Sequence, residues 1–379
     1  MTADIEITPV RSPAELDRFV RVPMRLNAND PAWIAPLLME RKEALTPKTN
    51  PFFEHAEVQL WLASRDGRDV GRISAQIDSL APPDPDGQIG HFGMIAGEDD
   101  EEVFAALLRT AEDWLRARGR TVARGPFNLS INEESGLLID GFETRPMVMM
   151  GHDPRYAGRR VEEQGYHKVK DLLAYIVDLT ADFPPGVRRR VNREAPGGVR
   201  LRNLDFKRYD EEVRVMVDIL NDAWSQNWGF TPVTEAEGRQ LAKSMRPVIN
   251  GDMVWFAELD GETVAYIVCL PNVNEAIEGL DGKLLPLGWA KLLWRLKVKG
   301  VEGGRVVLMG IRKGVAGGFR ATLIPFLMID AMAKGARKAG VKRVEMSWIL
   351  EDNRPMRSIV EAVGATAYKT YRIYQKSLV

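Results

Sequence analysis

The sequence predicts an α/β chain with mixed sheets, arranged as two similar domains in tandem. The length of 379 residues exceeds the usual domain size of about 100–200 residues. The same order of hairpin, helix, strand and strand-rich tail occurs once in each half, and 45% of the residues are hydrophobic, which is typical of globular proteins. We expect domains at residues 1–180 and 200–379, with a Pro-, Gly- and Arg-rich linker at about 181–199.

Each half contains a hairpin whose turn is marked by an Asp-Gly pair. The first hairpin lies in residues 58–77 and turns at Asp66 and Gly67. The second lies in residues 254–269 and turns at Asp260 and Gly261. Asp-Gly between alternating apolar runs is a strong hairpin signal, because the turn requires positive φ angles.

An amphipathic helix follows each hairpin, and a glycine caps its C-terminus. The helices are expected at residues 101–118, before Gly119, and at 322–338, before Gly340. The strands and tails that follow are expected at 121–127 and 161–179 in the first half, and at 341–350 and 360–378 in the second. The second half carries about 27 extra residues between its hairpin and its helix. We interpret the order as a tandem duplication with insertions.

Charge and cysteine content exclude several classes of function. The chain has 52 Lys and Arg residues against 53 Asp and Glu residues, so no nucleic-acid partner is expected. The single cysteine, Cys269, rules out an intrachain disulfide and a cysteine zinc site, and no other ligand spacing predicts a metal. No signal segment and no apolar run of about 20 residues is present, so the expected compartment is the cytoplasm.

Four segments of the second half resemble the GCN5-related N-acetyltransferase (GNAT) superfamily. They are AWSQNWGFTPVT (223–234), FAELDGETVAYI (256–267), VVLMGIRKGVAGGFRATLI (306–324) and ILEDNRPMRSIVEAVGA (349–365). The resemblance implies two GNAT-like domains, an acyl-CoA or acetyl-CoA donor and an amine acceptor.

The same resemblance implies a diphosphate loop that opens the helix at 322–338. Backbone N–H groups at a helix N-terminus bind such an anion. The implied cofactor-binding residues are Leu308, Gly310, Ile311, Arg312, Lys313, Gly317, Gly318, Phe319, Arg320, Ala321, Thr322 and Asn353. The family's Arg-Gly-x-Gly stands here as Arg320-Ala321-Thr322-Leu323, which also suggests a different donor such as an acyl carrier protein.

The equivalent loop of the first half is acidic. Residues 98–102 read Glu-Asp-Asp-Glu-Glu, and these side chains would repel a diphosphate while favouring the helix dipole. We therefore expect the first half to hold no cofactor, and instead to brace the second half or shape its substrate site.

The catalytic candidates are carboxylates and a phenol, since the family's proton-donating tyrosine is replaced by Val360, and by Val161 in the first half. Glu351 and Asp352 follow a predicted strand and could take a proton from an ammonium; the alternative is that this segment caps the next helix. Tyr371 could supply a phenol or lie in the core. The expected substrate-binding residues are Asn132, Glu133, Glu134, Trp224, Trp228 and Tyr266.

The extra segment of the second half is basic and apolar. Residues 283–299 contain five Lys or Arg residues and no acid, and Trp289, Leu292, Leu293 and Leu296 share one helical face. This pattern is typical of a helix that lies on an anionic membrane, which would put the protein peripherally at the inner membrane face. The alternative is an ordinary amphipathic helix that packs on its domain.

The chain is also similar, more weakly than to the GNAT superfamily, to the bacterial ceramide synthases. That similarity implies transfer of an acyl group, long-chain in this case, from acyl-CoA or a carrier protein to a sphingoid-type amine. Two alternatives stay open: an acetyltransferase for small amines, and a non-catalytic protein that binds ligands with the same fold.

Overall fold

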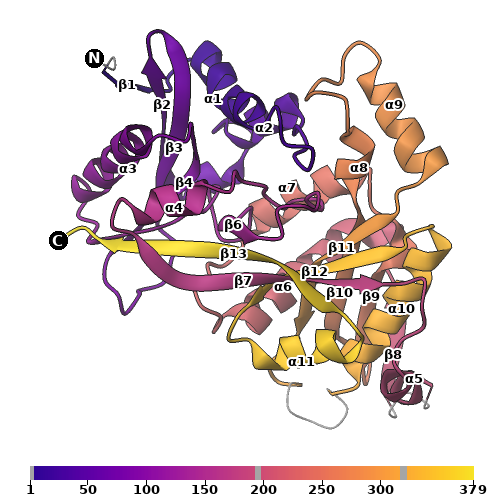
Figure 1. The fold of residues 1–379 in the computed structure, drawn as a ribbon. Helices are drawn as coiled ribbons and strands as arrows, with labels where there is room; N and C mark the ends of the chain where they lie inside the picture. The colour runs from indigo at the N-terminus through magenta and orange to yellow at the C-terminus, as the bar shows by residue number, and fades with distance from the viewer. Residues whose placement is uncertain (1–3, 193–197, 316–321) are drawn as a thin grey trace. The chain divides into compact units, whose positions relative to one another are not determined.

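The structure, a computed structural model, describes residues 4–192, 198–315 and 322–379 and divides into two compact units (Figure 1). Unit 1 comprises Met1–Leu172, Ile277–Leu284 and Lys369–Val379. Unit 2 comprises Leu173–Ala276 and Leu285–Tyr368.

Unit 1 is built on a mixed sheet with the strand order β1-β2-β3-β4-β5-β13. Its strands are β1 (Glu6–Pro9), β2 (Ala56–Arg65), β3 (Arg68–Asp78), β4 (Ile89–Gly97), β5 (Val122–Gly125) and, from Lys369 onward, β13 (Thr366–Ser377); β6 (Leu137–Asp140) pairs with β13, and β7 (His167–Asp178) begins in this unit. Only β4 and β5 pair in parallel among the pairs described here; β1–β2, β2–β3, β3–β4 and β5–β13 are antiparallel.

The helices of unit 1 cover this sheet with apolar faces. They are α1 (Pro13–Leu26), α2 (Leu38–Ala44), η1 (Pro51–Glu54), α3 (Glu101–Arg116) and α4 (Ala157–Glu162). A capping box between Ser12 and Glu15 begins α1, and the buried face of α3 includes Val103, Leu107 and Leu115.

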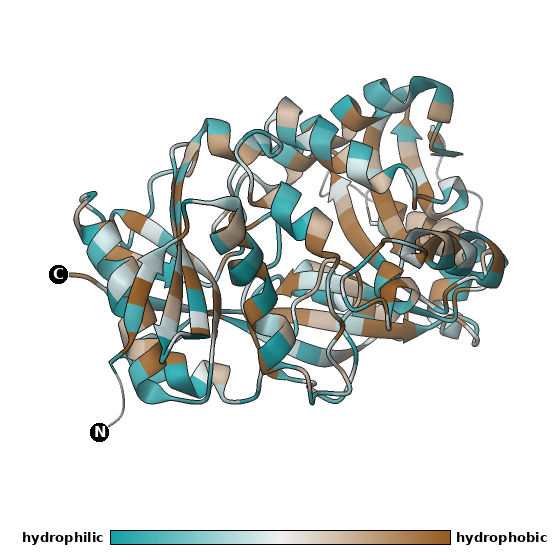
Figure 2. Cartoon of the chain, turned by 90° about the horizontal axis from the view of Figure 1, so that it is seen from above, coloured by the Kyte–Doolittle hydropathy of each residue, from teal (hydrophilic) through white to brown (hydrophobic). Residues whose placement is uncertain are grey.

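Unit 2 repeats the mixed sheet, with the strand order β7-β12-β11-β10-β9-β8. Its strands are the end of β7 from Leu173, β8 (Val199–Asn203), β9 (Val254–Leu259), β10 (Glu262–Pro271), β11 (Gly303–Ile311) and β12 (Arg343–Leu350). Strands β11 and β12 are parallel, whereas β8–β9, β9–β10 and β10–β11 are antiparallel. Hydrophobic residues recur along these strands (Figure 2).

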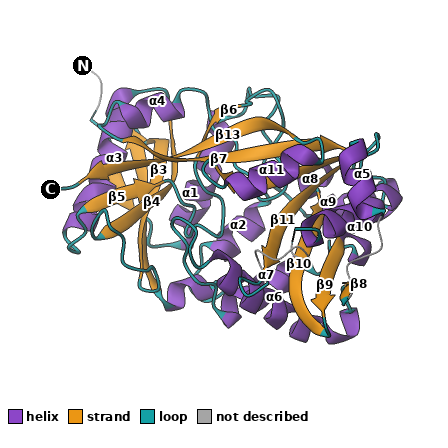
Figure 3. Ribbon diagram, turned by 90° about the horizontal axis from the view of Figure 1, so that it is seen from below, coloured by secondary structure: helices purple, strands orange, loops and turns teal. Residues whose placement is uncertain are grey.

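Helices cover both faces of the unit 2 sheet (Figure 3). Its helical segments are α5 (Pro185–Val191), η2 (Phe206–Arg208), α6 (Tyr209–Trp224), α7 (Glu235–Met245), η3 (Gly251–Met253), α8 (Val273–Ile277), α9 (Gly288–Trp294), η4 (Arg295–Lys299), α10 (Ile324–Lys338) and α11 (Arg354–Ala362). Helix α10 packs over β9 and β10 on the face of the sheet that carries the side chains of Ala265 and Ile267. Helix α6 covers the opposite face, where a Cβ atom on Gly310 would contact Ile219.

The predicted repeat is present, and its hairpins and helices lie where the sequence places them. Asp66 and Asp260 both adopt positive φ at the hairpin turns. The expected helices at 101–118 and 322–338 are α3 and α10. The predicted halves describe the repeat along the chain, but the compact units exchange strands: the end of β7 lies in unit 2, and most of β13 lies in unit 1. Part of the expected linker forms α5, which buries Val187 in the unit 2 core.

Candidate active site

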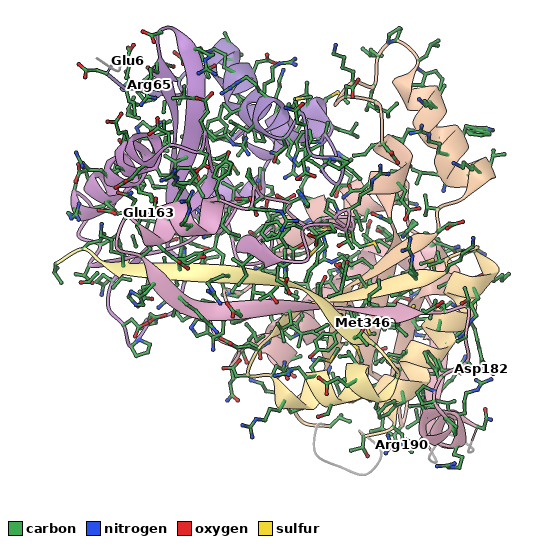
Figure 4. All side chains as sticks on the ribbon, in the orientation of Figure 1. Glu6, Arg65, Glu163, Asp182, Arg190 and Met346 are labelled. Carbon is green, nitrogen blue, oxygen red and sulfur yellow. The ribbon has the colours of Figure 1, made fainter. Side chains whose placement is uncertain are left out.

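Strands β11 and β12 of unit 2 separate into a fork. Their described parallel ladder runs from Gly303 opposite Arg343 to Val306 opposite Met346, a residue labelled in Figure 4, while β11 continues to Ile311. Next to this point β11 contains a β-bulge, because Val306 pairs with Cys269 and Leu308 pairs with Val268. A bulge bends its strand and re-aims the neighbouring side chains, which accounts for the divergence.

One side of the fork is lined by α6 and β10. A Cβ atom on Gly310 would lie 3.3 Å from Ile219 Cγ2 and 3.3 Å from Tyr266 Cε1, so this glycine allows close packing. Trp224 donates from Nε1 to the carbonyl oxygen of Met309 at 3.2 Å. Two of the predicted substrate-binding residues, Trp224 and Tyr266, therefore lie beside the end of β11.

Tyr266 is a buried phenol whose oxygen has no hydrogen-bond partner in the described part of the chain. Burial raises the pKa of Tyr266, so its hydroxyl keeps its proton at neutral pH. Trp228, the third predicted aromatic residue, is half-buried in the turn that follows α6.

The cations that begin the predicted diphosphate loop interact with α6. Arg312 Nη2 lies 2.5 Å from Asp218 Oδ2. The Lys313 backbone N–H donates to Asp222 Oδ2 at 2.8 Å, and its Nζ donates to Ser225 Oγ at 2.5 Å. Leu308 and Ile311 lie on β11 beside these contacts, and Thr322 is exposed before α10. Gly317, Gly318, Phe319, Arg320 and Ala321 lie outside the described residues.

The polar turn after β12 begins α11. The side chain of Asn353 accepts a hydrogen bond from the Met356 backbone N–H at 3.2 Å, which is the capping role given as the alternative for this segment. Arg357 donates to the Glu351 carbonyl oxygen at 2.8 Å. Glu351 is half-buried and Asp352 is exposed. The catalytic role of these two carboxylates stays a prediction.

Tyr371 lies in unit 1, whereas Glu351 and Asp352 lie in unit 2. Its side chain is buried, and its hydroxyl donates to the Gly151 carbonyl oxygen at 3.2 Å. The three predicted catalytic residues are therefore not brought together within one unit.

A buried ionic cluster at the base of the fork was not predicted. Arg305 lies opposite Glu345 in the β11–β12 ladder, with Nε 3.4 Å from the Glu345 carboxylate. Arg305 Nε also donates to Ser347 Oγ at 2.8 Å, and Ser347 and Tyr368 both donate to Glu345. The available signal was the placement of charged residues within apolar strands, since buried charges need partners.

Unit 1 contains an equivalent fork that its own chain fills. Strands β4 and β5 pair in parallel through His91 and Arg124, and β4 then carries a bulge opposite β3. The Met94 backbone N–H at this bulge donates to Asn128 Oδ1 at 2.7 Å. Met94 and Leu129 both adopt positive φ, which a non-glycine residue rarely does.

The segment that fills this fork brings four charged residues together, which we name the unit 1 polar cluster: Arg41, Arg72, Glu134 and Asp153. Glu134 accepts hydrogen bonds from Arg41 and, at 2.9 Å, from Asn128 Nδ2. Burial lowers the pKa of Arg72 to about 9 and raises that of Asp153 to about 7. Glu134, predicted to bind substrate, is thus held in an ion pair; Asn132 and Glu133 lie half-buried in the same segment.

The acidic start of α3 is neutralised by arginines. The Asp100 side chain caps the helix by accepting from the Glu102 backbone N–H, and Arg65 lies 2.6 Å from Asp100. Arg25 and Arg68 both pair with Glu98. These contacts give the acids a structural role at the position where a diphosphate would bind.

The described residues also bear on metal binding and on membrane spanning. No group of three or more His, Cys, Asp or Glu residues there could hold a metal ion. None of the helices described is both long enough and apolar enough to cross a bilayer.

The chain is similar to known proteins over nearly its whole length. It is 63% identical over 377 residues to a protein of Caulobacter vibrioides named bacterial ceramide synthase, covering 99% of this chain and 98% of the relative. It is 43% identical over 365 residues to the Escherichia coli protein YghO, covering 96% and 93%. No family model matches the chain.

Solved structures show the same fold at low sequence identity. A tandem GNAT protein from the clavulanic acid biosynthesis pathway has a TM-score of 0.58 at 14% identity and covers 99% of both chains. A GCN5-related N-acetyltransferase from Sphaerobacter thermophilus has a TM-score of 0.54 at 13% identity, covering 100% of this chain and 97% of that one. The predicted GNAT resemblance is confirmed: the chain belongs to the bacterial ceramide synthase family of acyltransferases, built on a tandem GNAT fold.

Proposed function

We propose that this acyltransferase joins an acyl group from an acyl thioester to the amine of a long-chain sphingoid-type lipid, forming a ceramide. The observation that carries the proposal is the 63% identity with the bacterial ceramide synthase of Caulobacter vibrioides, over 99% of this chain. We propose acyl-CoA as the donor, with an acyl carrier protein as the other thioester source.

The proposal puts the donor at the fork of unit 2. This choice is supported by the bulged β11, by Arg312 and Lys313 at its end, and by the filled fork of unit 1, where Asn128 already occupies the bulge amide. Main-chain amides at a bulge and cations beyond it suit a thioester carbonyl and a diphosphate respectively.

The reaction needs proton transfers around one attack. The ammonium of the acceptor first loses one proton to a carboxylate. The neutral nitrogen then forms a C–N bond with the thioester carbonyl carbon and loses a second proton as the C–S bond breaks, and the thiolate that leaves takes up a proton. Within unit 2, Glu351 and Asp352 are the proposed proton acceptors. Tyr371 is buried in unit 1, where its hydroxyl already donates to Gly151, so its phenol is not part of the proposed proton transfers.

Trp224, Trp228 and Tyr266 are the proposed substrate contacts of unit 2, and Leu308, Gly310, Ile311, Thr322 and Asn353 join Arg312 and Lys313 as proposed donor contacts. Asn132, Glu133 and Glu134 lie in the segment that fills the fork of unit 1, and a contact of theirs with substrate stays a prediction.

A lipid acceptor also implies contact with the membrane in which it resides. We include in the proposal a peripheral position at the inner face of an anionic membrane, reached through residues 283–299.

The test is a product assay with the purified chain, sphinganine, and either palmitoyl-CoA or acetyl-CoA. We expect an N-acylated product by mass spectrometry and equimolar thiol release, with palmitoyl-CoA preferred. Glu351→Gln and Asp352→Asn should lower kcat, while Glu262→Gln at the exposed start of β10 serves as the matched control. No amide product from either thioester or from an acylated carrier protein, with protein whose circular dichroism is native, would overturn the proposal.

A further inference from the structure

Exposed hydrophobic side chains are concentrated in one segment of unit 2. Six of the ten large hydrophobic side chains exposed among the described residues lie between positions 285 and 298. We name these six the apolar ridge: Leu285, Leu287, Trp289, Leu293, Trp294 and Val298. Leu285 is 80% exposed and Trp294 is 54% exposed. Several exposed apolar side chains within one short segment are typical of an interaction site in water-soluble proteins.

The ridge does not pack on its own unit. Neither α9 nor η4 contains a buried residue, and α9 stands apart from strands β8–β12 in Figure 1. Two side chains of the segment donate hydrogen bonds to carbonyl oxygens of unit 2: Trp289 Nε1 donates to Pro286 at 3.1 Å, and Arg295 donates to Ala276 at 2.8 Å. Leu292 and Leu296 of the predicted apolar face are half-buried, so the segment leaves the six ridge side chains exposed without burying a complete apolar face of its own.

Within residues 282–300 all charged side chains have the same sign. Lys291, Arg295, Lys297 and Lys299 lie within α9 and η4, and residues 282–300 contain no Asp or Glu. The whole chain carries a formal charge of -1, so this concentration of cations is a local feature. Aromatic and aliphatic side chains flanked by Lys and Arg suit the boundary between headgroups and acyl chains of an anionic bilayer.

The length of the helical segment fixes how it could meet a membrane. Residues 288–299 form α9 and η4, and twelve residues at about 1.5 Å each reach about 18 Å. A bilayer core is about 30 Å thick, so the segment is too short to cross and could only lie on the surface.

We infer that the apolar ridge and its cations dock this chain onto an anionic lipid surface. The inference deepens the proposed function, because a lipid amine resides in such a surface, but it rests on exposure and charge that are independent of catalysis.

The test measures binding of the full chain to vesicles by flotation. We expect binding to phosphatidylcholine vesicles that contain 30% phosphatidylglycerol, about tenfold weaker binding in 0.5 M salt, and little binding to pure phosphatidylcholine. A Trp289→Asp, Trp294→Asp double variant and a Lys297→Glu, Lys299→Glu double variant should each bind at least about tenfold more weakly. The matched controls are Met39→Asp and Lys243→Glu, which change an exposed methionine and an exposed lysine outside the segment.

The outcomes separate this inference from the proposed function. The inference would be overturned if wild-type protein did not bind anionic vesicles, or if the tryptophan double variant bound them as well as wild type does. Self-association that the tryptophan substitutions abolish, without lipid binding, would assign the ridge to a second copy and also overturn it. Vesicle binding without any amide product would overturn only the proposed function. Both variants should keep the circular dichroism spectrum and the Tm of wild type, which shows that they remain folded whether or not an amide product forms.

Discussion

Asp153 makes the stability of unit 1 depend on pH in a direction opposite to most carboxylates. Its Oδ2 accepts a hydrogen bond from the Leu138 backbone N–H at 3.0 Å. Burial is the largest influence and raises its pKa from 3.8 to about 7; Glu134 acts in the same direction, whereas Arg72, Lys369 and the Leu138 hydrogen bond oppose the rise. The folded state thus holds the Asp153 proton more tightly than the unfolded state does.

The sign and size of the effect follow from this difference in pKa. Stability contributed by the protonated form is fully present below about pH 4 and is lost as the pH rises through 7. A difference of about 3 pKa units corresponds to about 4 kcal/mol, of which about 2.5 kcal/mol is lost between pH 5 and pH 8. Replacing Asp153 with asparagine keeps an acceptor oxygen for Leu138 and removes the titration.

The assay is urea unfolding of wild type and Asp153→Asn at pH 5 and pH 8, followed by circular dichroism. We expect the free energy of unfolding of the variant, relative to wild type, to rise by about 2.5 kcal/mol from pH 5 to pH 8. Asp140→Asn, on β6 of the same unit, serves as the control substitution. The same variant-minus-wild-type difference at both pH values would refute the reasoning.

Three further predictions concern unit 2. Glu345→Leu should lower the free energy of unfolding by about 3–5 kcal/mol because Arg305 is left buried without its partner, and an unchanged urea midpoint would contradict this. Gly335→Ala should prevent native folding, seen as lost solubility or a collapsed Tm, since its Cβ would lie 1.7 Å from the Asp252 carbonyl oxygen. Lys313→Ala should weaken palmitoyl-CoA binding about tenfold in calorimetry, and unaltered binding would remove this residue from the donor site.

Local signals made much of the fold predictable. The turn at Asp66 and Gly67, the helix capped at Gly119 and their repetition about 200 residues later each depend on a few neighbouring residues. The exchange of β7 and β13 was not predictable in this way, because the pattern of a strand specifies its buried face and not the sheet it joins.

The candidate site was predicted only in part, for related physical reasons. Trp224 and Tyr266, expected from the sequence to bind substrate, both lie beside β11, but their role in substrate binding stays a prediction. The pairing of Arg305 with Glu345 depends on a ladder partner 40 positions away along the chain, which no local pattern specifies. Asn353 illustrates a real ambiguity, since the same amide that could contact a cofactor also caps a helix.

The strand exchange has a consequence for how the protein is made in the cell. The sheet of unit 1 takes most of β13, so it cannot be completed until residue 377 has left the ribosome, although residues up to 172 were synthesised much earlier. Domains usually fold as they emerge, N-terminal first. In this chain, the edge of β5 that pairs with β13 stays unpaired and exposed while the whole of unit 2 is translated. A stop codon directly after position 368 would therefore leave the sheet of unit 1 incomplete although all residues of unit 2 had been translated, and separate expression of the two halves would give aggregation-prone products.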